Sequence, residues 1–320
     1  MSSLKNIYIL GIGGVGGYFG GKIARALSAQ HAKGSGINVY FVARGKHLEE
    51  IKKHGLILNT VEEKHIICKP TLATDAVADL PEPDLCIICV KSYDLNPLLQ
   101  ALQGKIKRNT VIVPLLNGVD IYDRVRSKIT EAIVLPSCVY ISTYIDKPGV
   151  VTQEGGNCTI LFGKDPQNPS FDPAPLFDLF NISQIKYQWS DDPFPEIWIK
   201  FIFIASLGLV TAYTNKTFGQ LLESPELKEY VHSIMKEIHA ISVKKGINLP
   251  PEIVSLSMQK ISKFPYETMT SLQRDVQKNA KKHEGEIFGG AVIRLGRETG
   301  IPTPVTQSIY EKLANDGKLL

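Results

Sequence analysis

The chain lacks an apolar run long enough to span a bilayer. Its most apolar stretch, residues 201–213, is shorter than the roughly 20 residues that a membrane helix requires, and it is expected to form a buried helix instead. No basic segment followed by an apolar one opens the printed chain, so no secretory signal is expected. These absences favour a soluble, cytoplasmic protein with no membrane partner.

Cysteine is also scarce. The chain has five cysteines, and this low, odd count fits a reducing compartment. Cys86 and Cys89 have the spacing of a redox-active pair, but they lie in an apolar stretch, where residues three apart point to opposite faces of a strand. We interpret them as small buried side chains. No segment has the cysteine and histidine spacing of a metal site, so no metal is expected.

The chain has no strong excess of charge of either sign. Its net charge is +4 and is spread along the sequence, which argues against nucleic acid as a partner. The hydrophobic content of 43% and charged content of 21% are ordinary for a soluble globular protein. With 320 residues the chain can form two domains, or one large domain, with a full core.

A glycine-rich pattern near the N-terminus is the strongest positive signal. Residues 6–11 have the apolar, β-branched character of a buried parallel strand, and the run 18–27 predicts a helix. Glycines between them permit a tight turn, a close backbone approach to a pyrophosphate and close packing of helix on strand, while the helix N-terminus attracts the phosphate. In this context the G-x-G-x-x-G motif predicts dinucleotide binding. Its residues are Gly11, Gly13, Gly14, Val15 and Gly16.

The sequence just after the second predicted strand indicates which dinucleotide the chain binds. That strand is expected at residues 38–42, and an acidic residue after it would bind the ribose 2′-hydroxyl of NAD. The chain has Arg44 there, whose planar guanidinium can bind a 2′-phosphate. NADP is therefore favoured over NAD, the alternative being that Arg44 is simply a solvated residue after a strand.

Each of two further predicted apolar strands is followed by a polar residue. They are expected at 85–90 and 110–115, and they are followed by Lys91 and Asn117. In open α/β sheets, ligands bind beyond the carboxyl ends of the strands. Either residue alone could belong to an ordinary loop, but their matched positions favour a role in binding.

The strand signal stops near residue 190, after which helical periods continue to the end of the chain. The predicted fold class is α/β, with a Rossmann-type doubly wound sheet in an NADP-binding domain at 1–190 and an all-helical domain at 191–320. A hairpin that closes the sheet is expected from the strands 150–153 and 159–162. The remaining strands of the first half are expected at 55–58, 65–69, 132–141 and 185–189, with a short helix at 176–181.

One lysine stands out in the first predicted helix of the second half, residues 195–213. Lys200 is its only charged residue after Glu196. A lysine among such apolar neighbours either extends to the surface or faces a cleft, where desolvation can lower its pKa enough for proton donation. In a later predicted helix, Ser271 and Asp275 are four residues apart and share one face.

These landmarks follow one order along nearly the whole chain. After the glycine motif, Arg44, Lys91 and Asn117 come Glu196-Ile-Trp-Ile-Lys200, Thr270-Ser-Leu-Gln-Arg-Asp275, and Glu284 ahead of Gly290-Ala-Val-Ile-Arg-Leu. The order resembles the ketopantoate reductase (2-dehydropantoate 2-reductase) family. The resemblance implies an NADP-binding Rossmann domain and a helical C-terminal domain. It also implies NADPH-dependent reduction of a 2-keto acid to a 2-hydroxy acid, as in pantothenate biosynthesis.

The resemblance also assigns roles. It implies that Lys200 is the general acid that protonates the carbonyl oxygen, and that Glu284 binds the substrate's hydroxyl group. Ser271 and Asp275 match the family's substrate motif, in which the serine contacts the carboxylate. Asn117 matches a residue that reaches both substrate and nicotinamide ribose. The cofactor residues implied are Gly11, Gly13, Gly14, Val15, Gly16, Arg44, Lys91 and Asn117.

Two positions depart from the family pattern. The best-known members have asparagines four and eight residues after the lysine, where this chain has Ile204 and Gly208. A ligand group that loses a buried hydrogen-bond partner typically loses about 1–3 kcal/mol. An alternative is therefore a paralogous reductase of a less polar 2-keto acid. A second alternative is a non-catalytic NADP-binding regulator, which would have no need of Lys200 or Glu284. A homodimer through the helical domain is also considered.

Overall fold

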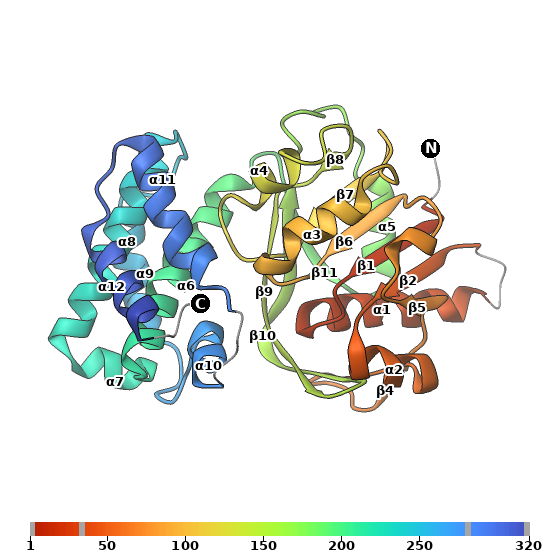
Figure 1. The fold of residues 1–320 in the computed structure, drawn as a ribbon, viewed down its shortest axis with the longest axis horizontal. Coiled ribbons are helices and arrows are strands. Elements are labelled where there is room, and N and C mark those ends of the chain that lie inside the picture. The colour runs from red at the N-terminus through yellow and green to blue at the C-terminus, as the bar shows by residue number, and fades with distance from the viewer. Residues whose placement is uncertain (1–3, 32–35, 279–282, 317–320) are drawn as a thin grey trace. The chain divides into compact units, whose positions relative to one another are not determined.

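The structure is a computed structural model that describes residues 4–31, 36–278 and 283–316 (Figure 1). The chain divides into two compact units, Met1–Leu116 with Ile121–Pro193, and Asn117–Asp120 with Phe194–Leu320. This division falls just after the boundary expected near residue 190. It also assigns residues 117–120 to the second unit, although they lie within the first half of the sequence.

A six-stranded parallel sheet forms the centre of the first unit, and the predicted Rossmann-type fold is confirmed. Each strand of four or five residues is almost wholly buried, as expected for strands that are covered on both faces. The order β5-β2-β1-β6-β7-β8 reverses its direction at β1, which lies between β2 and β6. The strands are β1 (Asn6–Leu10), β2 (Asn38–Val42), β5 (Leu72–Thr74), β6 (Leu85–Ile88), β7 (Val111–Pro114) and β8 (Ile133–Val134).

A second sheet in the first unit corrects two sequence-based expectations. The hairpin expected from 150–153 and 159–162 is wrong, because both segments belong to one long strand whose pairing contains bulges near Gly155. The strand expected at 132–141 is split at Pro136 between the two sheets. The second sheet contains β3 (Leu56–Asn59), β4 (Ile66–Cys68), β9 (Ser137–Lys147), β10 (Val150–Gly163) and β11 (Lys186–Ser190).

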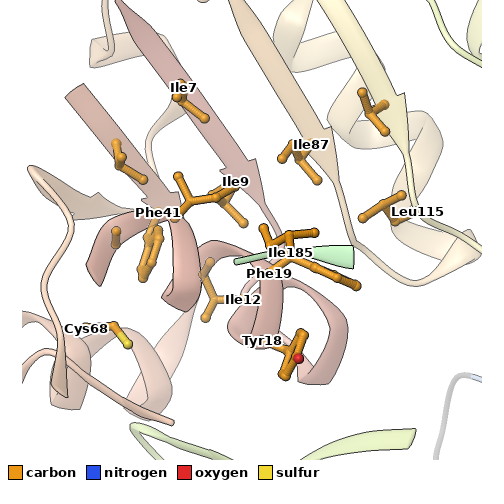
Figure 2. Packing of buried hydrophobic residues seen from close by; sticks show 14 of the residues in the cluster. Ile7, Ile9, Ile12, Tyr18, Phe19, Phe41, Cys68, Ile87, Leu115 and Ile185 are labelled. Carbon is orange, nitrogen blue, oxygen red and sulfur yellow. The ribbon is translucent and has the colours of Figure 1, made fainter. Parts of the chain in front are cut away.

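The first helix, α1 (Gly14–His31), contacts strands of both sheets. Figure 2 shows Phe19 of α1 near Ile9 and Ile87, which come from neighbouring strands of the parallel sheet and belong to the same buried cluster. On the other side, a Cβ atom at Gly17 would lie 2.5 Å from Val151 of β10. Small residues in α1 therefore allow it to pack closely on the second sheet.

Three helices of the first unit were not expected from the sequence. They are α2 (Gly45–His54), α3 (Ser92–Leu102) and α4 (Ile121–Arg126). In α2 only Leu48 and Ile51 are buried, so its apolar signal is short. Helix α3 buries Leu95, Leu98, Leu99 and Leu102 at helical spacing, and this signal was missed. The other helical elements of this unit are the 3₁₀ turn η1 (Val77–Asp79) and α5 (Ala174–Ile182).

The described part of residues 194–316 contains only helical elements. The central helix is α6 (Phe194–Thr214), which packs against α8, α10 and α12. It is 21 residues long, so it is longer than the apolar run expected, and by length and composition alone it could cross a membrane. However, 72% of its most apolar window is buried, as in a core helix. The others are α7 (Phe218–Glu223), α8 (Pro225–Lys244), α9 (Ile253–Ile261), α10 (Ser271–Gln277), the π-helical turn η2 (Glu286–Gly290), α11 (Ala291–Thr299) and α12 (Pro304–Asn315).

Candidate functional site

The glycine motif lies between β1 and α1, at the carboxyl edge of the parallel sheet. Gly11 has a φ of 96°, and its N–H donates to the carbonyl of Val42 at 3.0 Å, which joins the turn to the end of β2. A Cβ atom at Gly16 would lie 2.1 Å from the Gly11 oxygen, and one at Gly14 would lie 2.6 Å from the Thr143 oxygen. Packing therefore requires glycine at these positions.

Gly13 differs from the other glycines of the motif. A Cβ atom there would meet no atom within 4 Å, so the backbone borders open space. Beside it begins the 18-residue helix α1, which has no acidic residue in its first turn. Free N–H groups and the positive end of the dipole suit a phosphate group at this position. The chain's own geometry thus fits a dinucleotide, while Val15 packs against the hydrophobic core.

Arg44 and Lys91 stand at the same edge of the sheet. Arg44 is the residue before α2, its side chain is 66% exposed, and it pairs with Asp94 at 3.4 Å. Lys91 is the residue before α3, and Asp94 lies in the first turn of that helix. The neighbouring strands β1, β2 and β6 therefore end in three candidate cofactor segments. The contact between Arg44 and Asp94 was not expected from the sequence.

A histidine in the first turn of α2, His47, joins this helix to the second sheet. The Nδ1 atom of His47 accepts a hydrogen bond from the N–H of Gly149 at 3.0 Å, in the turn that joins β9 to β10. Burial lowers the pKa of His47, which keeps the ring neutral and Nδ1 available as an acceptor. This contact holds the start of α2, and with it Arg44, against the second sheet.

In the second unit the structure brings together two residues that are far apart in the sequence. Lys200 of α6 is 7% exposed, and its Nζ atom donates to Oδ1 of Asn117 at 2.8 Å. Lys200 therefore does not extend into solvent, which was one of the two options open from the sequence. Asn117 accepts through its side-chain oxygen, so the ammonium group is held in a fixed direction.

Glu284 comes directly before an irregular part of the same unit. It is 4% exposed, and the π-helical turn η2 begins two residues later and continues into α11. Such π-helical turns are frequent at functional sites. The adjacent His283 accepts a hydrogen bond from the N–H of Gly285 at Nδ1, at 3.2 Å. Burial lowers the pKa of His283, and the nearby carboxylate of Asp275 partly offsets this effect.

The segment with Ser271 is joined to α6 through two hydroxyl groups. Thr270 caps α10 by accepting from the N–H of Gln273 at 3.2 Å, and its hydroxyl lies 2.8 Å from that of Thr211. Ser271 is then the first residue of α10 and is exposed, while Asp275 on the same helix is half-buried. The second unit thus holds the candidate acid Lys200 and the candidate substrate segment on helices that pack against each other.

The two departures from the family pattern lie on α6. Ile204 is half-buried, whereas Gly208 is buried. A Cβ atom at Gly208 would lie 3.8 Å from Phe288 and 3.9 Å from Leu272, so both of these apolar side chains reach toward it. The surface of α6 beyond Lys200 is therefore bordered by hydrocarbon.

Comparisons with known proteins agree along most of the chain. Residues 7–167 match the family model described as "Ketopantoate reductase PanE/ApbA", and residues 194–315 match "Ketopantoate reductase PanE/ApbA C terminal". A 2-dehydropantoate 2-reductase of Streptococcus pyogenes is 27% identical over 95% of this chain and 95% of its own length.

Solved structures give the same result for the fold. A PanE/ApbA family ketopantoate reductase from Ralstonia eutropha has a TM-score of 0.84 and 25% identity, with 98% of this chain and 99% of that chain covered. D-mandelate dehydrogenase, solved with NADH and anilino(oxo)acetate, has a TM-score of 0.82 at 21% identity, with 98% and 99% covered. The second likeness concerns the fold alone.

Proposed function

The chain belongs to the ketopantoate reductase family, and from this premise we propose that it reduces 2-dehydropantoate (ketopantoate) to pantoate with NADPH. The observation that carries the proposal is the buried residue Lys200, whose ammonium group donates to Asn117 at 2.8 Å. Proton donation to a reacting carbonyl needs a donor fixed in direction, and Lys200 has that property. We further propose that the protein acts in the cytoplasm, in pantothenate biosynthesis.

In the proposed reaction each group has one task. A bound reduced nicotinamide supplies a hydride to the keto carbon. Lys200 gives one proton to the carbonyl oxygen, so that one hydride and one proton convert the ketone into a hydroxyl group. Asn117 orients the ammonium group. We assign to Glu284 a hydrogen bond from the substrate's hydroxyl group, and to Ser271 a hydrogen bond to its carboxylate.

Isotope transfer tests the reaction itself. The reaction is run separately with each of the two epimers of NADPH that carry deuterium at C4. One epimer should transfer its deuterium to C2 of pantoate, as detected by mass spectrometry of the product. Unlabelled product from both epimers, at undiminished yield, would mean that the cofactor is not the source of the hydride.

The cofactor preference is proposed from Arg44. Replacing it by alanine should weaken the binding of NADPH about 10- to 100-fold and the binding of NADH much less. The reason is that a hydrogen bond to a charged group contributes about 1.5–3 kcal/mol. Fluorescence titration of both cofactors gives the two dissociation constants. As a matched control, Arg25→Ala removes an exposed arginine of α1 that pairs with Glu63, and it should change neither constant. Equal losses for NADPH and NADH in Arg44→Ala would remove the proposed role in phosphate binding.

A second candidate function is reduction of a less polar 2-keto acid. It is favoured by Ile204 and Gly208, and by the apolar side chains of Leu272 and Phe288 near Gly208. D-mandelate dehydrogenase, a neighbour in fold, was solved with anilino(oxo)acetate, which carries an aromatic group. A value of kcat/KM for 2-ketoisovalerate well above that for ketopantoate would favour this second function over the first.

Ile204 offers a direct test of substrate selection. Ile204→Asn should raise the ratio of kcat/KM for ketopantoate to that for 2-ketoisovalerate about five- to tenfold, because the amide can pair with the polar hydroxymethyl group. Gly208→Ala is the control, since a methyl group fits at 3.8 Å from its nearest neighbour and adds no polar atom. If both variants shift the ratio equally, polarity at position 204 does not select the substrate.

A further inference from the structure

An ion pair in the second unit joins two elements that carry candidate site residues. The carboxylate of Asp120 accepts a hydrogen bond from the guanidinium of Arg294, on α11. Asp120 is 4% exposed, so its charge is almost removed from water. Arg294 also pairs with Glu298, one turn further along α11, at 3.1 Å. A buried carboxylate of this kind depends on its cation.

Asp120 ends the short segment that begins with Asn117. Between them, Gly118 has a φ of 126°, which disfavours side-chain-bearing residues, and Val119 is 7% exposed. The segment therefore has an anchor near each end, at the hydrogen bond of Asn117 with Lys200 and at the ion pair of Asp120 with Arg294. These contacts explain why residues 117–120 group with the second unit.

Arg294 is also connected to Glu284. The turn η2 begins two residues after Glu284 and continues directly into α11, which carries Arg294. The Arg294 side chain thus joins the helical segment that follows Glu284 to the segment that contains Asn117.

We propose that Arg294 is a positioning residue for the reduction: through Asp120 it holds the Asn117 side chain at the ammonium group of Lys200. This inference rests on the proposed function. Without the ion pair, the segment 117–120 loses its anchor at Arg294, and the donor group of Lys200 is held less firmly in its direction. A displacement of about 1 Å at a reacting group can lower a rate about 100-fold.

A double-mutant cycle tests this connection. Arg294→Met should lower kcat about 10-fold or more, and Arg294→Lys should restore most of the loss. In an Asn117→Ala background, Arg294→Met should cause less than a twofold further loss, because residues that act through one contact are not additive. Equal losses in both backgrounds would show that Arg294 acts on the fold in general, and would overturn the proposal.

Two controls separate positioning from instability. Glu298→Gln removes the other partner of Arg294 and should leave kcat within about twofold of the original value. If Arg294→Met does not fold, the double variant Asp120→Asn with Arg294→Met leaves no unpaired buried charge, and it should show the same loss of kcat. An unchanged kcat in that double variant would contradict the proposed role.

A chemical readout makes the result independent of the proposed function. Acetic anhydride labels lysine amines, and peptide mass spectrometry gives the labelling rate of Lys200 without substrate or cofactor. Arg294→Met should raise this rate at least about threefold, because the amine is released from Asn117. If labelling rises but the original protein reduces no keto acid, the proposed function has failed, while the coupling of Arg294 to the Asn117–Lys200 contact stands. Unchanged labelling would overturn the positioning role.

Discussion

Replacing Lys200 by methionine is expected to lower kcat for keto acid reduction by about 10²- to 10⁴-fold, the usual contribution of a general acid. Methionine fills a similar volume among the buried neighbours of α6 but cannot donate a proton. NADPH binding should persist, because the glycine motif and Arg44 belong to the first unit. Stopped-flow or steady-state kinetics, together with a fluorescence titration of NADPH, measure the two effects separately.

Two variants sharpen the interpretation of Lys200. Lys200→Arg keeps a positive charge, but a guanidinium group is not deprotonated in proteins and so cannot serve as the acid. It should remain almost as slow as Lys200→Met; recovery of the rate by arginine would mean that Lys200 acts through charge alone. Lys236→Met, which changes an exposed lysine of α8, should leave kcat unchanged.

The largest expected effect on stability comes from Arg126. Its guanidinium pairs with Asp165, and the two side chains are 6% and 0% exposed. Arg126 also donates to the carbonyl of Ala132 at 2.7 Å, while Asp165 accepts from the N–H of Val134 at 3.0 Å. Arg126→Met leaves the carboxylate buried without its cation, and this should cost about 3–5 kcal/mol in the free energy of unfolding.

Urea denaturation followed by circular dichroism measures this loss. In a thermal melt the same change should lower the midpoint by about 10 °C, given the usual entropy of unfolding of a unit of this size. Tyr122→Phe is the control, since it removes the hydroxyl that donates to Asp165 and accepts a longer hydrogen bond from Arg126, and it keeps the ion pair. It should cost only about 1 kcal/mol. If the two variants lose the same stability, the ion pair is not what stabilises this part of the first unit.

The sequence predicted the parallel sheet well because its strands are buried on both faces. The predicted strand at 38–42 has the same bounds in the structure. The second sheet was harder to predict. Gly156 and Cys158 both have positive φ values, which is typical of a turn, yet here they form bulges within the single strand β10. Local turn signals cannot distinguish the two cases, because strand pairing decides between them.

For the candidate site, the sequence proposed residues but did not predict their contacts. Lys200 and Asn117 were singled out separately, on a predicted helix and after a predicted strand. Their hydrogen bond joins positions 83 residues apart, and no spacing rule predicts such a contact. The ion pairs of Arg44 with Asp94 and of Arg294 with Asp120 were likewise not predicted, since each needs the packing of two elements. Arg294 lies within the motif at 290–295, but the sequence assigned no role to Asp94, Asp120 or Arg294.

We propose that this chain is an NADPH-dependent ketopantoate reductase. The most direct measurement is the consumption of NADPH by the purified protein at increasing ketopantoate concentration. We expect a saturable rate with a KM in the usual range of about 1 μM to 1 mM, and a lower kcat/KM for 2-ketoisovalerate. No consumption of NADPH with either keto acid, by protein that still binds NADPH, would contradict the claim and favour a non-catalytic NADP-binding regulator.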